Sequence, residues 1–181
     1  MALFEGLRLK LTAMMDFAQE TSPEFRVFLH KRPTKVDLGL YAEHLSRQLG
    51  LSDDVIALAY WYIVKLKETN PQFQLEALNA SRVLLTSVVV ACKFAEDDHV
   101  LLKNAAKAGG LPVRELVRME ACFLKALGWN LPLGDTSELK AALHVDLSST
   151  ADHTSESDDD EYFAGLSYED NQEYSELSAF F

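Results

Sequence analysis

The chain has 181 residues and a net charge of −11, a length that suits one domain with a buried core. Residues 1–145 hold 17 acidic and 17 basic side chains, whereas 146–181 hold 11 acidic ones and no Lys or Arg, and a neutral body without a basic stripe argues against nucleic acid as the main ligand. Two cysteines without CxxC spacing and the lack of an 18-residue apolar run argue against disulfides, zinc and a membrane span, so we expect an intracellular protein of the cytoplasm or nucleus.

The first predicted element is an amphipathic helix within residues 1–22. Its apolar residues recur at spacings of three and four, which is the period of one helix face. They are Phe4, Leu7, Leu11, Met14, Met15 and Ala18. The polar face is not strongly basic, so packing on the domain is favoured over binding to a membrane surface. Residues 23–36 contain Pro23 and Pro33 and are predicted to be a connector.

Two helices are predicted between residue 37 and Pro71. Asp37 is a suitable cap for the first, which runs to about Leu49 and ends at Gly50. Ser52 caps the second, which has acidic residues in its first turn and lysines near its end, as the helix dipole favours.

The next segment, Val83–Phe94, is apolar on all sides and rich in Val, so its period alone does not separate a buried strand from a buried helix. Every flanking segment is predicted to be helical and no partner strand is evident. We therefore predict an all-α fold in which this segment is the central buried helix. Lys93 then places an ammonium group inside an apolar setting.

Two more helices follow. A short one near Leu101–Ala108 is closed by two glycines, and the last starts at Pro112. In the last helix the apolar stripe is predicted to contain Val113, Val117, Leu124 and Leu127, with Glu120 completing it. A carboxylate is thus predicted on an apolar face, as the Lys93 ammonium is.

Motifs of catalysis are missing from the sequence, which has no phosphate-binding glycine loop, no HExxH and no GxSxG. The acidic cluster "EDDHV" at Glu96–Val100 has groups that bind divalent cations, but an acidic loop between helices is usually solvated. We predict a non-catalytic protein without a cofactor or a bound metal.

Lys93 and Glu120 allow two interpretations. In the first, Lys93 extends past its helix end to solvent, or the two side chains pair with each other. In the second, both lie at the rim of a partner-binding surface, where the ammonium donates to carbonyls at the end of a partner helix and the carboxylate accepts from backbone amides. Spacing alone favours the first.

Three segments resemble the cyclin box, and most closely that of P- and U-type cyclins related to the fungal phosphate-sensing cyclin: "LLTSVVVACKFAEDD", "NAAKAGGLPVREL" and "RMEACFLKALGWNL". The residues that match in order are Arg82, Lys93, Asp98, Asn104, Lys107, Gly109, Gly110, Glu115, Leu116, Glu120, Phe123 and Leu124. The resemblance covers about residues 37–133 and implies a single cyclin box of five helices around the third.

The resemblance also implies a function, that of the regulatory subunit in a heterodimer with a cyclin-dependent protein kinase. It implies that Lys93 and Glu120 contact the regulatory helix of the kinase and the loop before it, and that Leu84 and Phe94 lie near the same surface. Cell-cycle control and phosphate signalling are the roles that such a cyclin would have. The alternatives are a cyclin-fold helical adaptor and a transcription-factor-like scaffold, neither of which activates a kinase.

The chain departs from the cyclin pattern in three places. Val64 stands where cyclins usually have an Asp that pairs with an Arg of the first box helix, so that ion pair is expected to be missing. The Met-Arg-Ala-Ile-Leu motif by which cell-cycle cyclins dock substrates has no counterpart in "LGLYAEHLSRQLGL". Ala106 and Ala108 replace the usual Tyr and Val around Lys107, which trims that surface.

Residues 134–181 are predicted to be an acidic, mostly disordered tail, because charge is high and no helical stripe is evident from Val145 onward. Ser155 and Ser157 precede acidic residues, the setting that acidophilic kinases prefer, so phosphorylation there is expected to add charge and tune partner binding or turnover. An inert solubilising tail is the alternative.

Overall fold

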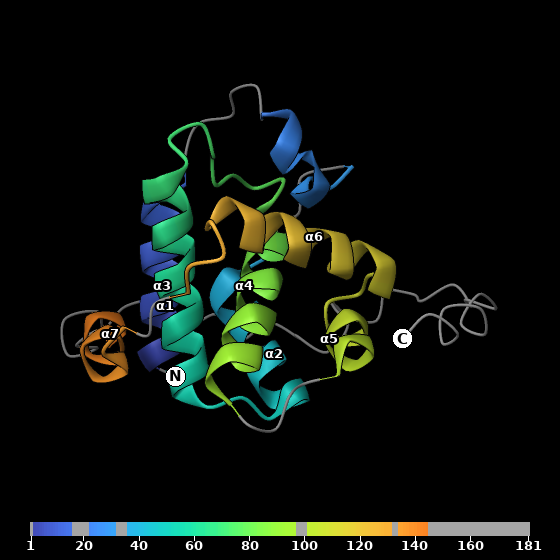
Figure 1. Ribbon diagram of the computed structural model, residues 1–181. Helices are drawn as coiled ribbons and strands as arrows, with labels where there is room; N and C mark the ends of the chain where they lie inside the picture. Colours follow the sequence, from blue (N-terminus) through green and yellow to red (C-terminus); the bar gives the residue numbers. More distant parts are fainter. Residues whose placement is uncertain (1, 16–21, 32–35, 97–100, 132–133, 145–181) are drawn as a thin grey trace. The chain divides into compact units, whose positions relative to one another are not determined.

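The computed structural model describes residues 2–15, 22–31, 36–96, 101–131 and 134–144, all within the compact unit Met1–Ala151 (Figure 1). Over these ranges it contains seven α-helices, one 3-10 helix and no strand, which confirms the predicted all-α fold. The predicted disorder of the acidic tail, and the candidate phosphorylation sites Ser155 and Ser157, lie outside the described residues.

Helices α2 (Leu38–Leu49) and α3 (Asp53–Thr69) begin and end at the predicted residues. The Asp37 carboxylate accepts hydrogen bonds from the backbone N–H groups of Gly39 and Leu40 at the start of α2. Gly50 closes α2 at φ 67°, a left-handed conformation that glycine adopts without strain. Ser52 Oγ accepts from the N–H of Val55 and starts α3.

Helix α4 (Ala80–Ala95) is the core of the fold and confirms the predicted central helix. Its residues from Val83 to Cys92 are all buried, and it packs against α2, α3, α5 and α6. The two hydroxyls between Val83 and Cys92 are satisfied, because Thr86 Oγ1 donates to the Arg82 carbonyl at 2.7 Å and Ser87 Oγ donates to the Ala59 carbonyl at 2.5 Å.

Helices α5 (Leu102–Ala108) and α6 (Val113–Ala126) pack against α4 and against each other (Figure 1). The buried face of α6 consists of Leu116, Met119 and Phe123. The predicted apolar stripe with Glu120 is therefore not the buried face of α6. Within it Val113 and Leu124 are partly buried, and Val117 is 45% exposed.

Two segments outside the predicted box add apolar contacts. Helix α1 (Ala2–Ala13) buries Leu3, Leu7 and Leu11 and packs on α2 and α3. Residues 23–36, predicted as a plain connector, contain the 3-10 helix η1 (Pro23–Phe28). Its Phe25 and Phe28 are buried against Phe73 and Phe123, with ring centroids 4.9 and 6.5 Å apart respectively.

Helix α7 (Thr136–Leu143) lies in the range predicted as tail, which is a correction to that boundary. Asp135 caps it through the N–H groups of Ser137 and Glu138. Lys140 Nζ lies 2.9 Å from Asp54 Oδ1 of α3, and Leu143 is fully buried. Helix α7 packs on both α1 and α3, so its ordering comes from tertiary contacts rather than from its own short sequence.

Candidate partner-binding surface

An ion pair joins the end of α4 to α6. Lys93, in the last turn of α4, places Nζ 2.6 Å from Glu120 Oε1 in the third turn of α6. The Lys93 side chain is 35% exposed and that of Glu120 is 13% exposed. The pairing that the first interpretation of the sequence described is present, and the pair still reaches solvent. It is therefore available to a partner as well.

Large apolar side chains are exposed on the two helices that carry this pair and at the start of α5, which packs on both of them. Phe94 follows Lys93 and is 44% exposed, Val117 lies one turn before Glu120, and Leu101 at the start of α5 is 59% exposed. We call these three side chains together with Lys93 and Glu120 the pair surface. Exposed apolar groups around a fixed polar pair are typical of a protein interface, in which burial supplies free energy and the polar pair sets register.

The four residues predicted to bind a partner separate into two groups. Lys93, Glu120 and Phe94 contribute to the pair surface. Leu84 does not, because it has no exposed area and lies in the buried middle of α4. Its predicted contact with a partner was wrong, and its role is to fill the core.

A second ion pair, which the sequence interpretation missed, joins the start of α4 to α6. Arg82 Nη2 lies 2.9 Å from Glu115 Oε2, and the Arg82 side chain is 19% exposed. Arg82 and Glu115 are both among the residues that match the cyclin box in order. Nothing else in the sequence indicated that they pair. Together the two pairs anchor α6 to both ends of α4.

A histidine lies beside this second pair. His30 Nε2 is 2.9 Å from Ser81 Oγ, within hydrogen-bonding distance. Burial, assisted by the positive charge of Arg82 and opposed by Glu115, lowers the pKa of His30 below its usual value. Burial likewise raises the pKa of Tyr41 on α2. In both cases burial favours the neutral form of the group.

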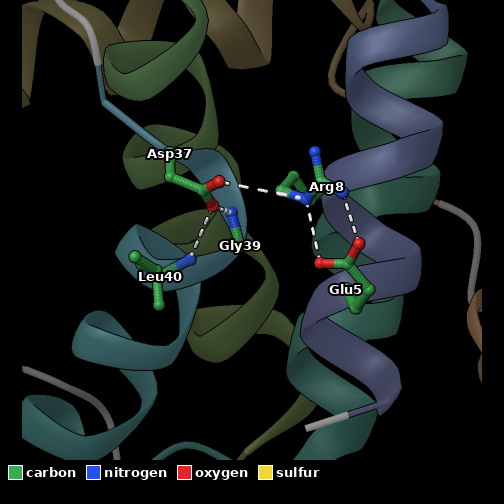
Figure 2. Close-up of polar contacts among 5 residues, drawn as sticks. All are labelled: Glu5, Arg8, Asp37, Gly39 and Leu40. Carbon is green, nitrogen blue, oxygen red and sulfur yellow. Dashed lines mark hydrogen bonds and ion pairs between the residues drawn. The ribbon is translucent and has the colours of Figure 1, made fainter. Parts of the chain in front are cut away.

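Figure 2 shows a polar cluster between α1 and α2. Arg8 Nε donates to Glu5 Oε2 at 2.8 Å and lies 3.9 Å from Asp37 Oδ2, so one guanidinium holds both its own helix and the cap of α2. A Cβ atom on Gly39 would lie 2.8 Å from the Phe4 carbonyl oxygen, so the two helices approach closely there. These contacts position α1 against α2. They do not point to a catalytic or binding site.

A metal site requires a group of potential ligands, and a membrane span requires a long apolar helix. No group of three or more potential ligands gathers among the described residues. In the acidic loop only Glu96 is described, and its carboxylate accepts from Ser52 Oγ at 2.8 Å. None of the described helices has the length and apolarity needed to cross a bilayer.

Comparison with known proteins agrees with the helix arrangement around α4. The sequence model of the cyclin family matches residues 9–131, about two thirds of the chain. The chain belongs to the cyclin family. The match begins inside α1, so this cyclin extends further toward the N-terminus than the box predicted for residues 37–133.

The curated relatives to which this cyclin is similar include U- and P-type cyclins. It is 33% identical to Cyclin-U2-2 of Arabidopsis thaliana over 91 residues, which are 50% of this chain and 40% of that protein. It is 32% identical to Cyclin-U4-1 of the same plant over 100 residues, 55% and 49% of the two chains. It is 34% identical to Cyclin-P2-1 of Oryza sativa subsp. japonica over 100 residues, 54% and 46%. The matched part thus spans less than half the length of these relatives.

Proposed function

We propose that this cyclin is the non-catalytic regulatory subunit of a cyclin-dependent protein kinase, and that it binds the regulatory helix of the kinase at the pair surface. The observation that supports this most is the partly exposed Lys93–Glu120 pair with Phe94 and Val117 beside it. An ammonium and a carboxylate side by side offer a donor for the carbonyls at one end of a partner helix and an acceptor for backbone amides.

The mechanism follows from what a protein kinase requires. Its activity depends on an ion pair between a strand lysine and a glutamate of the regulatory helix, which forms when that helix is turned inward. A cyclin that binds the inward state more tightly shifts the population toward it. A change from about 1% to about 99% active needs roughly 5.5 kcal/mol of differential binding. Burial of Phe94, Val117 and Leu101 is suited to supply most of it, while Lys93 and Glu120 fix the register.

A double substitution tests the assignment. Lys93→Ala/Glu120→Ala should weaken kinase capture by about 30-fold, the effect of losing an interface hot spot of about 2 kcal/mol. Removing both partners avoids leaving one charge unpaired, so the helix content and melting temperature should stay near those of wild type. The matched control is Lys65→Ala/Glu68→Ala, which removes a 2.7 Å surface pair on α3.

Exchanging the two charges of the pair provides a sharper test. Lys93→Glu/Glu120→Lys keeps an ion pair within the chain but exchanges the donor and the acceptor offered to a partner. We expect a folded protein that no longer captures the kinase or stimulates phosphorylation of a general kinase substrate. If both double variants captured the kinase as strongly as wild type does, Lys93 and Glu120 would not belong to the kinase-binding site. Capture without stimulated phosphorylation would instead favour a helical adaptor.

A further inference from the structure

The positive charge of the described fold is concentrated on α5 and α6. Residues 101–131 contain five basic side chains and two acidic ones, whereas residues 2–96 contain eleven of each sign. The two acidic residues, Glu115 and Glu120, are paired with Arg82 and Lys93 of α4. Both carboxylates of these two helices are therefore engaged by α4. The five basic side chains of α5 and α6 are Lys103, Lys107, Arg114, Arg118 and Lys125, all exposed.

On α6 these charges form an edge beside the pair surface. At 3.6 residues per turn, Arg114, Arg118 and Lys125 fall within an arc of about 40°, and Val117 lies about 60° further round the helix. Arg118 and Lys125 form no ion pair within the described part of the chain. The outward side of α6 thus has an apolar strip with Glu120 and, next to it, a cationic edge.

This arrangement has the anatomy of an interface with a charged rim. The centre of an interface buries apolar groups, while charges at its rim stay partly hydrated and act mainly on the rate and the selectivity of encounter. A positive rim attracts a partner whose facing rim is negative and repels one whose rim is positive. At physiological salt the attraction extends over about 8 Å, so it acts only between surfaces that are close to docking.

We infer that the cationic edge of α6 selects a kinase with acidic residues around its regulatory-helix surface, and that Arg118 and Lys125 accelerate its association. This inference rests on the proposed function, because the kinase at the pair surface is the partner in question. It adds the chemistry of that partner, which shape and apolar burial alone do not specify.

Association kinetics of the full-length chain with the kinase that it captures provide the test. Arg118→Glu/Lys125→Glu should lower the association rate constant about tenfold at about 50 mM salt, and the difference from wild type should shrink to about twofold near 0.5 M. The dissociation rate should change less, since rim charges act mainly on encounter. Both side chains are exposed, so circular dichroism should show an unchanged fold.

The control variant is Lys10→Glu/Lys31→Glu, which makes the same change in net charge at two exposed lysines outside α5 and α6. Its association rate should stay within about twofold of wild type. Equal slowing by both variants would mean that only net charge matters, and an unchanged rate for the α6 variant would mean that the edge faces no acidic rim. Either result overturns the inference while the kinase still binds. If the wild-type chain captures no kinase, the proposed function fails as well.

Discussion

Leu84 and Phe94 lie on the same helix in different surroundings, and their substitution should separate folding from binding. Leu84→Ala removes a fully buried side chain and should lower the free energy of unfolding by about 2–5 kcal/mol, as core truncations do. Phe94→Ala removes a side chain that is 44% exposed, so it should cost less than about 1 kcal/mol of stability and still weaken kinase capture. Urea unfolding and pull-down measure the two effects. A folded Phe94→Ala protein that captures kinase normally would exclude Phe94 from the interface.

His30 should make the stability of the fold sensitive to mild acid. Burial lowers the pKa of His30 from its usual 6.5, so the unfolded chain takes up a proton at a higher pH than the folded chain. The His30 contribution is therefore complete above pH 6.5 and is lost as pH falls below that value. In urea unfolding between about pH 5 and pH 8, His30→Gln should show a shallower loss of stability on acidification. Identical pH profiles for the variant and wild type would contradict this.

Among single residues, the sequence supports some assignments better than others. Lys93 and Glu120 were recognisable because a charge within an apolar run needs a partner, and each provides the other with one. Leu84 was misplaced because every neighbour in its run is also apolar, so the pattern contains no information about which side reaches the surface. Only the helices packed around α4 decide that.

At the scale of elements, Gly6 controls how α7 docks on α1. A Cβ atom at Gly6 would overlap the carbonyl oxygen of Leu143, and backbone atoms there have no room to move aside. Gly6→Ala should therefore separate the two helices, cost about 2 kcal/mol or more, and raise the hydrogen-exchange rates of α7 amides. Gly50→Ala is the control, because nothing lies within 4 Å of its Cβ position and only the positive φ opposes it, at about 1 kcal/mol. Similar exchange of α7 in both variants would contradict the prediction.

The bounds of α2 and α3 were predictable from their capping residues, whereas the buried face of α6 and the short helices η1 and α7 were not predictable. Asp37, Gly50 and Ser52 define the bounds of α2 and α3 by local hydrogen bonds and backbone conformation. In α6, Leu116 and Val117 are adjacent and both apolar, so two stripes fit the same period and the core selects one. Helices η1 and α7 have six and eight residues, too few for a period to be evident, and depend on contacts distant in sequence.

At the scale of the whole molecule, α7 should unfold together with the box. Trp61 of α3 lies against Gly134 at the approach to α7, and Lys140 pairs with Asp54 of the same helix. The chain has two tryptophans, Trp61 and Trp129. The substitution Trp129→Phe leaves Trp61 alone, so tryptophan fluorescence then reports on this region. The fluorescence and far-UV circular dichroism transitions should coincide in urea, as in a single cooperative unit. A fluorescence change at clearly lower urea would show that α7 detaches first.

The contact of Gly6 with Leu143 also brings the first and last helices of the described bundle together. A short linker from α7 back to α1 would close the backbone into a ring, and the ring could be reopened at the exposed turn around Gly50. In such a circular permutant α1 and α2 would leave the ribosome last instead of first, while every contact of Lys93 and Glu120 would be preserved. It would show whether assembly of this bundle depends on chain order or only on the final packing.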